Sequence, residues 1–493
     1  MEKKLIKKNL TNLEPSATLA INEKSKELIL KGKRVYRFGF GQSPFPVPEK
    51  IVSVLKKNAD KKAYLPMQGL PELREAVSSY LSKKTRTIFQ KENIIITPGS
   101  KEGMFLMHMA FNGDIILPAP SWVSYAPQAK IASNKVHWIQ TSADNNWFPT
   151  ADELEKKIKS IKNKNIILIL NSPNNPSGTT CNNLKELSKV AKKYKIIILS
   201  DEIYTDLKFD ENYESISRYY PEGTCITGGL SKWCGAGGWR LGFFAAPKQL
   251  STLMDNLKVL ASETFSTVNS PVQYAAVEAY QGNYEEFKLK TTNILKAVGA
   301  YAYKKLRSNK VLINPPQGGF YLMPEFINNK YKTSSDMCVA ILKETGVALL
   351  PGSAFGFKPS KMLVRLSFTD FDGSNFLKNI SQTRNTNTLQ LLDSLSVVNE
   401  AVYVPVGNAF SYIENNNPEI NLYMDDQKHP SPNATYLAAC VFYTAITKES
   451  PKGLPRRFQG ENIDGKKIFY IITEKNTSPI LQEVADKVTK DFR

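Results

Sequence analysis

The sequence predicts an α/β protein whose large domain holds a mostly parallel sheet, followed by a smaller α/β domain and a C-terminal α/β appendage. Two observations carry this prediction. Short runs that are apolar throughout recur between residues 94 and 246, and segments with apolar residues at helical spacing separate them. Strands that are apolar throughout are typical of a parallel sheet covered by helices on both faces. Such sheets bind ligands at the carboxyl ends of their strands.

The individual elements follow from the same two patterns. An aliphatic run between turn residues predicts a strand, and apolar residues every three to four positions predict a helix. We expect strands at Ile94–Ile96, Ile115–Leu117, Ile166–Leu170, Ile196–Leu199 and Gly242–Ala246. We expect helices at Pro71–Lys83, Lys101–Phe111, Leu184–Ala191 and Asn283–Ser308, and a loop at Gly39–Pro48.

The chain has 493 residues, a length that suggests about three domains. Residues 1–45 are expected to be an N-terminal segment of the small domain, and residues 46–290 the large domain. Residues 291–385 would complete the small domain. A polar stretch over residues 379–387 marks the next boundary, and residues 392–493 form a further α/β segment.

Composition limits the classes of partner. The net charge is +19, but the lysines are spread along the chain, which favours a solvated basic surface over a nucleic-acid site. The five cysteines lack the paired spacing of a zinc site, and there are three histidines, so no metal is expected. No apolar run is long enough to span a membrane, and no apolar stretch follows the basic N-terminus as in a signal peptide. A cytoplasmic protein is the expectation.

The segment with the strongest chemical pattern runs from Ser231 to Gly242 (SKWCGAGGWRLG). Lys232 follows a turn of small residues, a glycine-rich stretch comes next, and Arg240 lies eight residues on. A lysine that forms an imine must be partly neutral, which burial or a neighbouring cation achieves. Backbone N–H groups and an arginine suit a phosphate. Taken alone, the segment is also compatible with a surface lysine beside a glycine-rich loop.

Polar residues follow several predicted strands. Asn175 lies in the turn Asn171–Gly178, and Asp201 and Tyr204 follow the next strand. These residues could contact a ligand, but Asn and Asp also serve as turn and helix-capping residues. Gly99-Ser100-Lys101 precedes a predicted helix, whose N-terminus favours anions. Trp122 follows a predicted strand and suits either stacking on an aromatic ligand or the core.

Further motifs appear in a fixed order around these residues. Together they resemble class I aminotransferases of pyridoxal-phosphate (PLP) fold type I, with the bacterial aspartate aminotransferase branch the most similar. The resemblance covers roughly residues 10–380. The additional motifs are Leu13–Thr18, Tyr64–Arg74, Gly318–Tyr321, Pro351–Gly356 and Val364–Ser367.

The resemblance implies a role for each candidate. Lys232 would carry PLP as a Schiff base and shuttle a proton between the substrate's α-carbon and the cofactor. Asp201 would pair with the ring nitrogen, so that the ring remains an electron sink. Tyr204 and Asn175 would hydrogen-bond the ring oxygen O3′, and Trp122 would stack on the ring.

The resemblance also implies how the phosphate is held. Its ligands would be Ser100, the Lys101 backbone, Ser231 and Arg240. Tyr64 would reach the phosphate of a neighbouring subunit, which implies a homodimer. One departure concerns position 229, where the family often has a hydroxyl residue. This chain has Gly229, so one phosphate contact is missing or the Gly228–Gly229 backbone replaces it.

Substrate binding is expected on the other side of the ring. Arg365 would bind the substrate's α-carboxylate, assisted by the Gly41 backbone, with Trp122 and Asn175 nearby. In the resembled branch, a lysine at the position of Lys101 is linked to the distal carboxylate of aspartate or glutamate. Lys101 could instead face the phosphate or solvent, and neutral or aromatic amino acids stay open as substrates.

Two other functions are compatible with parts of this pattern. A β-lyase uses the same cofactor residues for elimination. A non-catalytic binding protein on this fold is a third reading, which the intact Lys232 and Asp201 disfavour.

Residues 392–493 lie beyond the expected aminotransferase. The stretches Val402–Ala409, Asp425–Ser431 and Tyr436–Tyr443 resemble the last part of an SGNH-type hydrolase. In that family an aspartate and a histidine three positions apart complete a catalytic triad, and Asp426 and His429 fit this spacing. No block resembling the family's serine motif precedes them. We therefore expect a partial module that does not hydrolyse.

Overall fold

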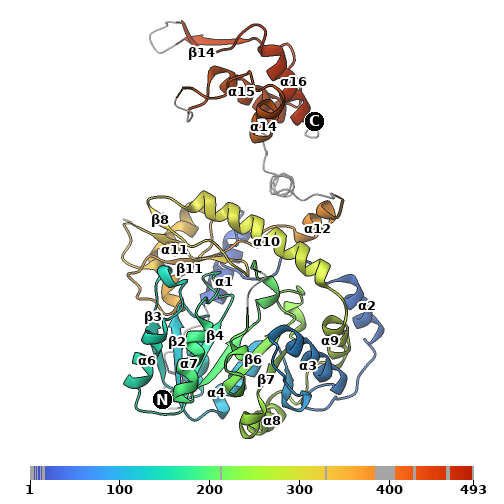
Figure 1. The fold of residues 1–493 in the computed structure, drawn as a ribbon, viewed down its shortest axis with the longest axis vertical. Helices are drawn as coiled ribbons and strands as arrows, with labels where there is room; N and C mark the ends of the chain where they lie inside the picture. Colours follow the sequence, from blue (N-terminus) through green and yellow to red (C-terminus); the bar gives the residue numbers. More distant parts are fainter. Residues whose placement is uncertain are drawn as a thin grey trace. The chain divides into compact units, whose positions relative to one another are not determined.

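The chain folds into two compact units, residues 1–382 and 383–493. Figure 1 shows their secondary structure. The computed structural model describes residues 17–210, 214–327, 330–382, 406–425, 429–461 and 467–490, with positions 5, 7, 9–11 and 13 before them.

A seven-stranded sheet lies at the centre of the first unit, in the order β1-β7-β6-β5-β4-β2-β3. All neighbouring pairs are parallel except those of β7, which runs antiparallel to β1 and β6. The prediction of a mostly parallel sheet is confirmed. The strands are β1 (Ile94–Thr97), β2 (Asp114–Ala119), β3 (Val136–Gln140), β4 (Ile166–Asn171), β5 (Ile197–Asp201), β6 (Thr224–Gly229) and β7 (Gly242–Ala245).

Two of these strands, β3 and β6, were not predicted. Strand β3 (VHWIQ) lies at the edge of the sheet, so half-buried polar residues are tolerated there. Strand β6 (TCITGG) is buried throughout but ends in two glycines. Neither sequence contains a continuous apolar run of the kind from which the other strands were predicted.

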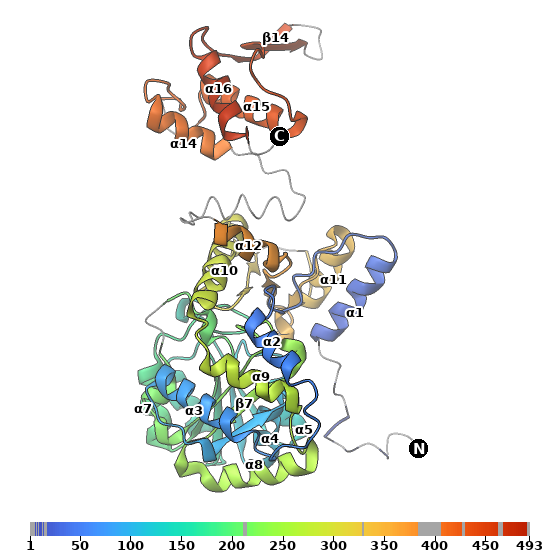
Figure 2. The ribbon, with the colours of Figure 1, turned by 90° about the vertical axis from the view of Figure 1, so that its right-hand side faces the viewer.

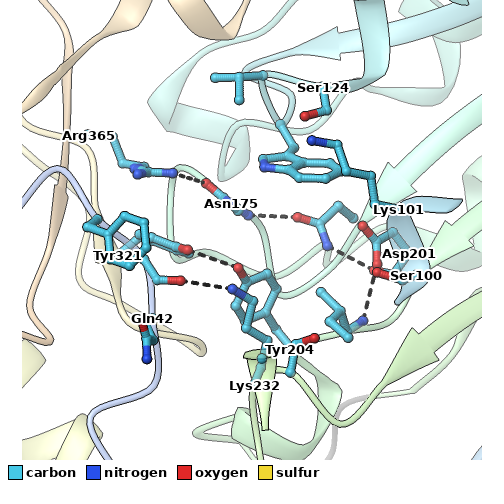
Figure 3. Close-up of a pocket in the computed structure, with 18 of the residues that line it drawn as sticks. Gln42, Ser100, Lys101, Ser124, Asn175, Asp201, Tyr204, Lys232, Tyr321 and Arg365 are labelled. Atoms are coloured by element: carbon cyan, nitrogen blue, oxygen red, sulfur yellow. Dashed lines mark hydrogen bonds between the residues drawn. The ribbon is translucent and has the colours of Figure 1, made fainter. Parts of the chain in front are cut away.

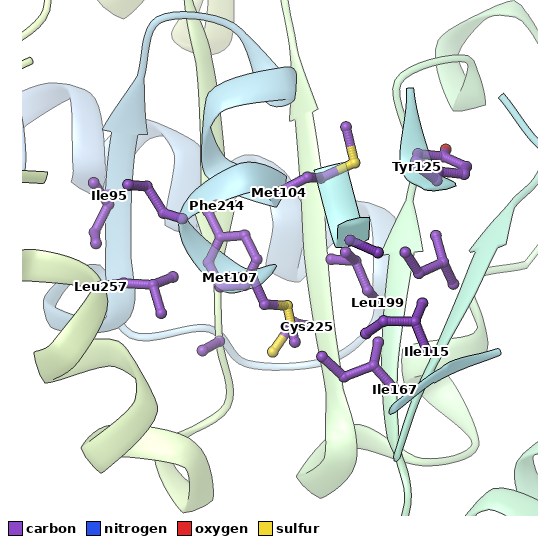
Figure 4. Packing of buried hydrophobic residues seen from close by; sticks show 14 of the residues in the cluster. Ile95, Met104, Met107, Ile115, Tyr125, Ile167, Leu199, Cys225, Phe244 and Leu257 are labelled. Carbon is purple, nitrogen blue, oxygen red and sulfur yellow. The ribbon is translucent and has the colours of Figure 1, made fainter. Parts of the chain in front are cut away.

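Helices cover both faces of the sheet because consecutive strand residues point to opposite sides. In β4, Ile167 and Ile169 pack in a cluster with helices α4 and α8, shown in Figure 4. Leu168 and Leu170 pack in a second cluster with α6 and α7. Burying one such side chain stabilises the fold by roughly 1.5–3 kcal/mol. The helices are α4 (Ser100–Ala110), α5 (Tyr125–Ile131), α6 (Ala151–Ser160), α7 (Leu184–Tyr194) and α8 (Ser251–Thr264).

Three further helices, α2 (Glu49–Lys57), α3 (Pro71–Thr85) and α9 (Ser270–Gln281), pack together, with α2 and α3 both against α9 (Figure 2). The long helix α10 (Glu285–Leu306) follows them in the chain. After it, a small antiparallel sheet has the order β11-β12-β9. The elements of this part of the chain are β8 (Val311–Leu312), β9 (Tyr321–Leu322), β10 (Glu325–Phe326), α11 (Ser334–Thr345), β11 (Leu350–Pro351), β12 (Val364–Ser367) and α12 (Gly373–Gln382).

The N-terminal part of the chain joins this smaller sheet. After α1 (Ala17–Leu30), Tyr36 forms a parallel bridge with Val347. The Ser367 N–H donates to the Phe38 carbonyl over 2.7 Å. Residues 39–48 then continue as a loop that reaches the carboxyl edge of the large sheet.

The C-terminal unit has a hydrophobic cluster of its own, which includes Ile413, Leu437 and Leu481. Asp426 lies outside the described residues, and His429 is exposed. None of the helices in the described parts of the whole chain combines the length and apolar composition needed to cross a bilayer. The elements of this unit are α14 (Val406–Asn416), α15 (Pro432–Thr447), the hairpin of β13 (Arg457–Glu461) with β14 (Lys467–Ile472), and α16 (Ser478–Val488).

Candidate active site

A cavity of about 520 Å³ opens at the carboxyl ends of β4 and β5. Its lining comes from segments that are far apart in the sequence, from residue 40 to residue 365. Figure 3 shows ten of its side chains by name. Every candidate residue except Tyr64 lines it: Gly41, Ser100, Lys101, Trp122, Asn175, Asp201, Tyr204, Ser231, Lys232, Arg240 and Arg365.

Lys232 lies in the loop after β6 and points into the cavity. Its Nζ donates to the Gly41 carbonyl over 2.8 Å and lies 5.5 Å from the Tyr204 ring centroid. Burial, and then the cations Arg365 and Arg240, lower the pKa of Lys232 to about 8, although Asp201 acts against them. Roughly a tenth of the amine is therefore neutral at pH 7, far more than for an ordinary lysine, and the neutral form is the one that imine formation requires.

Asp201 ends β5, in register with Asn171 of β4, which places it at the carboxyl edge of the sheet. Its Oδ2 accepts a hydrogen bond of 2.6 Å from the Tyr125 hydroxyl, and its Oδ1 accepts one of 3.3 Å from the Ile203 N–H. Burial raises the pKa of Asp201 to about 6, while these two donors lower it. The carboxylate is thus largely ionised at pH 7, in a position to pair with a cationic group in the cavity.

Arg365 lies on β12 and is 2% exposed. Its guanidinium donates to the Asn175 Oδ1 over 3.0 Å and to the Gly39 carbonyl over 2.6 Å. The remaining nitrogen, Nε, is buried and has no hydrogen-bond partner among the described residues. Buried donors are rarely left unpaired, and a carboxylate is the natural partner of a guanidinium.

Positive groups also gather around the start of α4, whose first residue is Ser100. The free N–H groups of a helix N-terminus favour an anion. Arg240 donates to the Gly237 and Pro98 carbonyls over 3.0 and 3.1 Å. Gly99 has a φ of 83°, and a Cβ there would overlap the Arg240 guanidinium. Glycine at position 99 therefore lets the arginine cross the helix start.

Lys101 and Trp122 form a second part of the wall. The Lys101 Nζ lies 5.3 Å from the Trp122 ring centroid, and the Trp122 ring meets that of Tyr125 edge to face at 5.4 Å. Burial and the neighbouring Arg240 lower the pKa of Lys101. The side chain therefore places a second cation beside the aromatic wall, close to the anion-binding end.

The structure places Tyr64 and Gly229 outside this cavity. Tyr64 is 89% exposed. Gly229 pairs with Gly242 in the sheet, and a Cβ at position 229 would lie 2.7 Å from the Leu241 carbonyl oxygen. The close packing of β6 on β7 thus leaves no room for a hydroxyl side chain there. Neither Gly228 nor Gly229 lines the cavity.

Two tyrosines of the site had no assigned role. Tyr125 is the hydrogen-bond donor to Asp201. The Tyr321 hydroxyl lies 2.9 Å from the Tyr204 hydroxyl, and the Arg365 guanidinium lies 4.8 Å from the Tyr321 ring centroid. Tyr321 ends the motif Gly318–Tyr321, so its presence was visible in the sequence. Its contacts depend on strand pairing that the sequence does not reveal.

The residues present fit PLP. Lys232 is an amine with a lowered pKa, and Asp201 is a buried carboxylate that suits a protonated ring nitrogen. The start of α4 with Arg240 suits the phosphate, and the Arg365 guanidinium suits a substrate carboxylate. All of these groups line the same cavity.

Residues 33–376 match the family described as aminotransferase class I and II. The aspartate aminotransferase of Geobacillus stearothermophilus is 32% identical over 376 residues, which are 73% of this chain and 93% of that protein. The aspartate aminotransferase of Pyrococcus horikoshii is 35% identical over 354 residues (69% and 87%). The asparagine–oxo-acid transaminase of Streptococcus mutans is 30% identical over 380 residues (74% and 94%).

Solved structures agree with this match. The alanine aminotransferase of Pyrococcus furiosus superposes with a TM-score of 0.69 at 27% identity, covering 74% of this chain and 95% of the other. The aspartate aminotransferase of Thermotoga maritima gives 0.66 at 28%, covering 79% and 98%. All residues that line the cavity fall within residues 33–376. The chain belongs to the class I and II aminotransferases and is an aminotransferase of PLP fold type I that uses PLP as its cofactor.

Proposed function

We propose that this aminotransferase moves the amino group of aspartate or glutamate to a 2-oxo acid, with PLP held by Lys232. The observation that carries the proposal is the single cavity that brings together Lys232, Asp201 and Arg365. Bound PLP supplies an electron sink that stabilises negative charge on the substrate's α-carbon. Borohydride reduction of the PLP-loaded protein tests the attachment, since the label must then appear on Lys232.

The chain's own groups have distinct tasks in this proposal. The Lys232 Nζ takes the proton from the substrate's α-carbon. Asp201 holds a proton on the ring nitrogen, since its ionised carboxylate is buried beside the cavity. Tyr204 and Asn175 donate hydrogen bonds to the ring oxygen O3′, and Trp122 stacks on the ring.

The two anionic ends of the ligands are held by separate groups. Ser100, the Lys101 backbone, Ser231 and Arg240 bind the phosphate at the start of α4. Arg365 binds the α-carboxylate, and orients the α-carbon for proton transfer. The loop of residues 39–48 also reaches this part of the cavity, because the Gly41 carbonyl accepts a hydrogen bond from Lys232.

The Lys101 side chain supports the choice of a dicarboxylic substrate. Arg365 and Lys101 both line the cavity and lie on opposite sides of the drawn residues in Figure 3, an arrangement of two cations that suits a substrate with two carboxylates. The names of the relatives in Geobacillus and Pyrococcus point to the same substrate. A panel of amino donors with 2-oxoglutarate is the test, and Lys101→Ala is expected to lower kcat/KM for aspartate roughly tenfold while sparing alanine. Release of pyruvate from cysteine conjugates in place of transfer would indicate a β-lyase.

We further propose a homodimer in which Tyr64 reaches the phosphate of the neighbouring subunit. Its support is the exposed Tyr64 side chain, 89% accessible in the single chain. Mixing Lys232→Ala with Tyr64→Ala subunits tests the idea. A shared site predicts recovered activity in the hybrid, because one of its two sites has neither substitution. Unrecovered activity in a confirmed hybrid would contradict it.

The remaining assignments follow the sequence. We propose residues 1–45 and 291–385 as the small domain and residues 46–290 as the large domain. All five cysteines are buried free thiols, which supports the reducing cytoplasm as the place of action.

We propose residues 392–493 as a partial SGNH-like module without hydrolase activity. An esterase assay with p-nitrophenyl acetate, comparing the intact protein with His429→Ala, tests this, since equal rates are expected.

A further inference from the structure

Tyr321 occupies the point where four parts of the proposed site meet. It lies on β9, which pairs with β12, the strand that carries Arg365. Its hydroxyl is 2.9 Å from that of Tyr204, and a methyl group at Gly41 would overlap it. Gly41 is also the residue whose carbonyl accepts from Lys232. The tyrosine is 1% exposed, so its hydroxyl has a fixed set of neighbours.

The direction of the hydrogen bond between the two tyrosines decides what Tyr321 can do. Either hydroxyl could donate. The Arg365 guanidinium lies over the Tyr321 ring, 4.8 Å from its centroid, and a cation there stabilises negative charge on that phenol. Burial raises the pKa of both phenols, and Arg365 lowers both, so acidity does not choose the donor. The proposed function does: a hydroxyl has one proton, and if Tyr204 donates it to the ring oxygen of PLP, its own oxygen is left to accept from Tyr321.

We infer that Tyr321 is a positioning residue that donates its hydrogen bond to the Tyr204 oxygen. This leaves the Tyr204 proton free to point into the cavity and fixes its direction. Because hydrogen bonds in a chain polarise one another, Tyr204 also becomes a stronger donor. The inference rests on the proposed function, in which Tyr204 donates to the ring oxygen of PLP. It adds a group on the small sheet that sets the strength of that contact.

The consequence can be read from the proton affinity of the Lys232 nitrogen. A donor to the ring oxygen spreads its negative charge, and negative charge beside a nitrogen favours protonation there. Loss of the Tyr204 donor is therefore expected to raise the pKa of that nitrogen in the PLP-loaded protein. Loss of the Tyr321 hydroxyl is expected to raise it less, because Tyr204 remains but is a weaker and less well-directed donor.

The test is a pH titration of the visible absorbance of the PLP-loaded, full-length protein. The variants are Tyr204→Phe, Tyr321→Phe and the double variant. Tyr194→Phe is the matched control, since its hydroxyl bonds to Glu155 on α6, outside the cavity. We expect Tyr204→Phe to raise the midpoint by about one pH unit and Tyr321→Phe by about half a unit. The double variant should match Tyr204→Phe alone, because Tyr321 acts through Tyr204.

Each outcome bears on a different claim. A Tyr321→Phe midpoint equal to that of the wild type, or a double variant whose shift is the sum of the single shifts, would overturn the inference. Circular dichroism of each variant shows whether it folds, and the phenylalanine keeps the ring under Arg365. A wild-type protein without a pH-dependent PLP band would overturn the proposed function itself, and the role of Tyr321 with it.

Discussion

In the first compact unit, the buried Arg365 keeps one guanidinium nitrogen without a partner among the described residues, and Lys232 and Asp201 face the same cavity. In the C-terminal unit, the buried Gln482 donates to the Tyr436 hydroxyl over 2.6 Å and to the Leu454 carbonyl over 2.8 Å. These two polar side chains thus bond within the unit, but the Thr444 Oγ1 there is, like the Arg365 Nε, buried without a partner among the described residues. An unpaired buried atom alone therefore does not identify a ligand site. What sets Arg365 apart is that it lines a cavity together with Lys232 and Asp201, two groups with shifted pKa values. The family match, which ends at residue 376, follows the same division.

The largest effect that would break this contrast is the loss of the lysine. Lys232→Ala removes the amine that we propose attaches PLP and moves the proton. Loss of an acid–base group alone costs about 10²–10⁴-fold, and loss of the attachment adds to it, so kcat/KM for transamination should fall by about 1000-fold or more. Steady-state assays with aspartate and 2-oxoglutarate measure it. Activity within tenfold of the wild type would mean that the cavity is not the site.

A smaller loss is expected at the carboxylate. Asp201→Asn keeps the shape but removes the charge that we propose pairs with the ring nitrogen, and should lower kcat roughly 100-fold. Tyr125→Phe removes only the 2.6 Å hydrogen bond to Asp201 and should cost about tenfold. Comparing the kcat values of the two variants separates the effect of the Asp201 charge from that of the Tyr125 hydrogen bond to it. A larger loss in Tyr125→Phe than in Asp201→Asn would contradict this ranking.

The lowered pKa of Lys232 predicts how PLP attaches at different pH values. Only the neutral amine attacks, so the rate of PLP loading should rise as pH increases through about 8. Arg365→Gln removes a cation that lowers the pKa, and should move the midpoint upward. Asp201→Asn removes an anion that raises the pKa, and should move it downward. Stopped-flow absorbance gives each midpoint. A downward shift in Arg365→Gln or an upward shift in Asp201→Asn would contradict this electrostatic explanation.

These tests concern a site that the sequence predicted in part. Asn175 follows an aliphatic run and Asp201 follows the next one, and parallel strands bring their carboxyl ends together, so the proximity of these two residues followed from the pattern. Their proximity to Lys232 was implied only by the family resemblance, because the strand before Lys232, β6, was not predicted. Tyr321 could not be placed in this way, because its partner Tyr204 is 117 residues away and lies in the turn after β5, a strand of the other sheet. Strand β6 was not predicted for a different reason: it ends in two glycines, which interrupt the apolar pattern of a buried strand. Close packing against β7 nevertheless requires glycine at position 229.

The smallest effect should come from the second unit. Deletion of residues 392–493 leaves every residue that lines the cavity in place. The kcat/KM of the shortened protein should therefore stay within about twofold of the wild type, since substitutions that touch no site group change free energies little. Thermal unfolding of the same sample shows whether it folds. A folded but inactive protein would show that the two units do not work separately.

The most direct measurement of the central claim is the mapping of the PLP attachment site. The purified protein is loaded with PLP, reduced with borohydride, digested and examined by mass spectrometry, with Lys232→Ala and Lys101→Ala as parallel samples. We expect one modified peptide containing Lys232, unchanged in Lys101→Ala and absent from Lys232→Ala. Stoichiometric label on another lysine, with Lys232 unmodified, would contradict it.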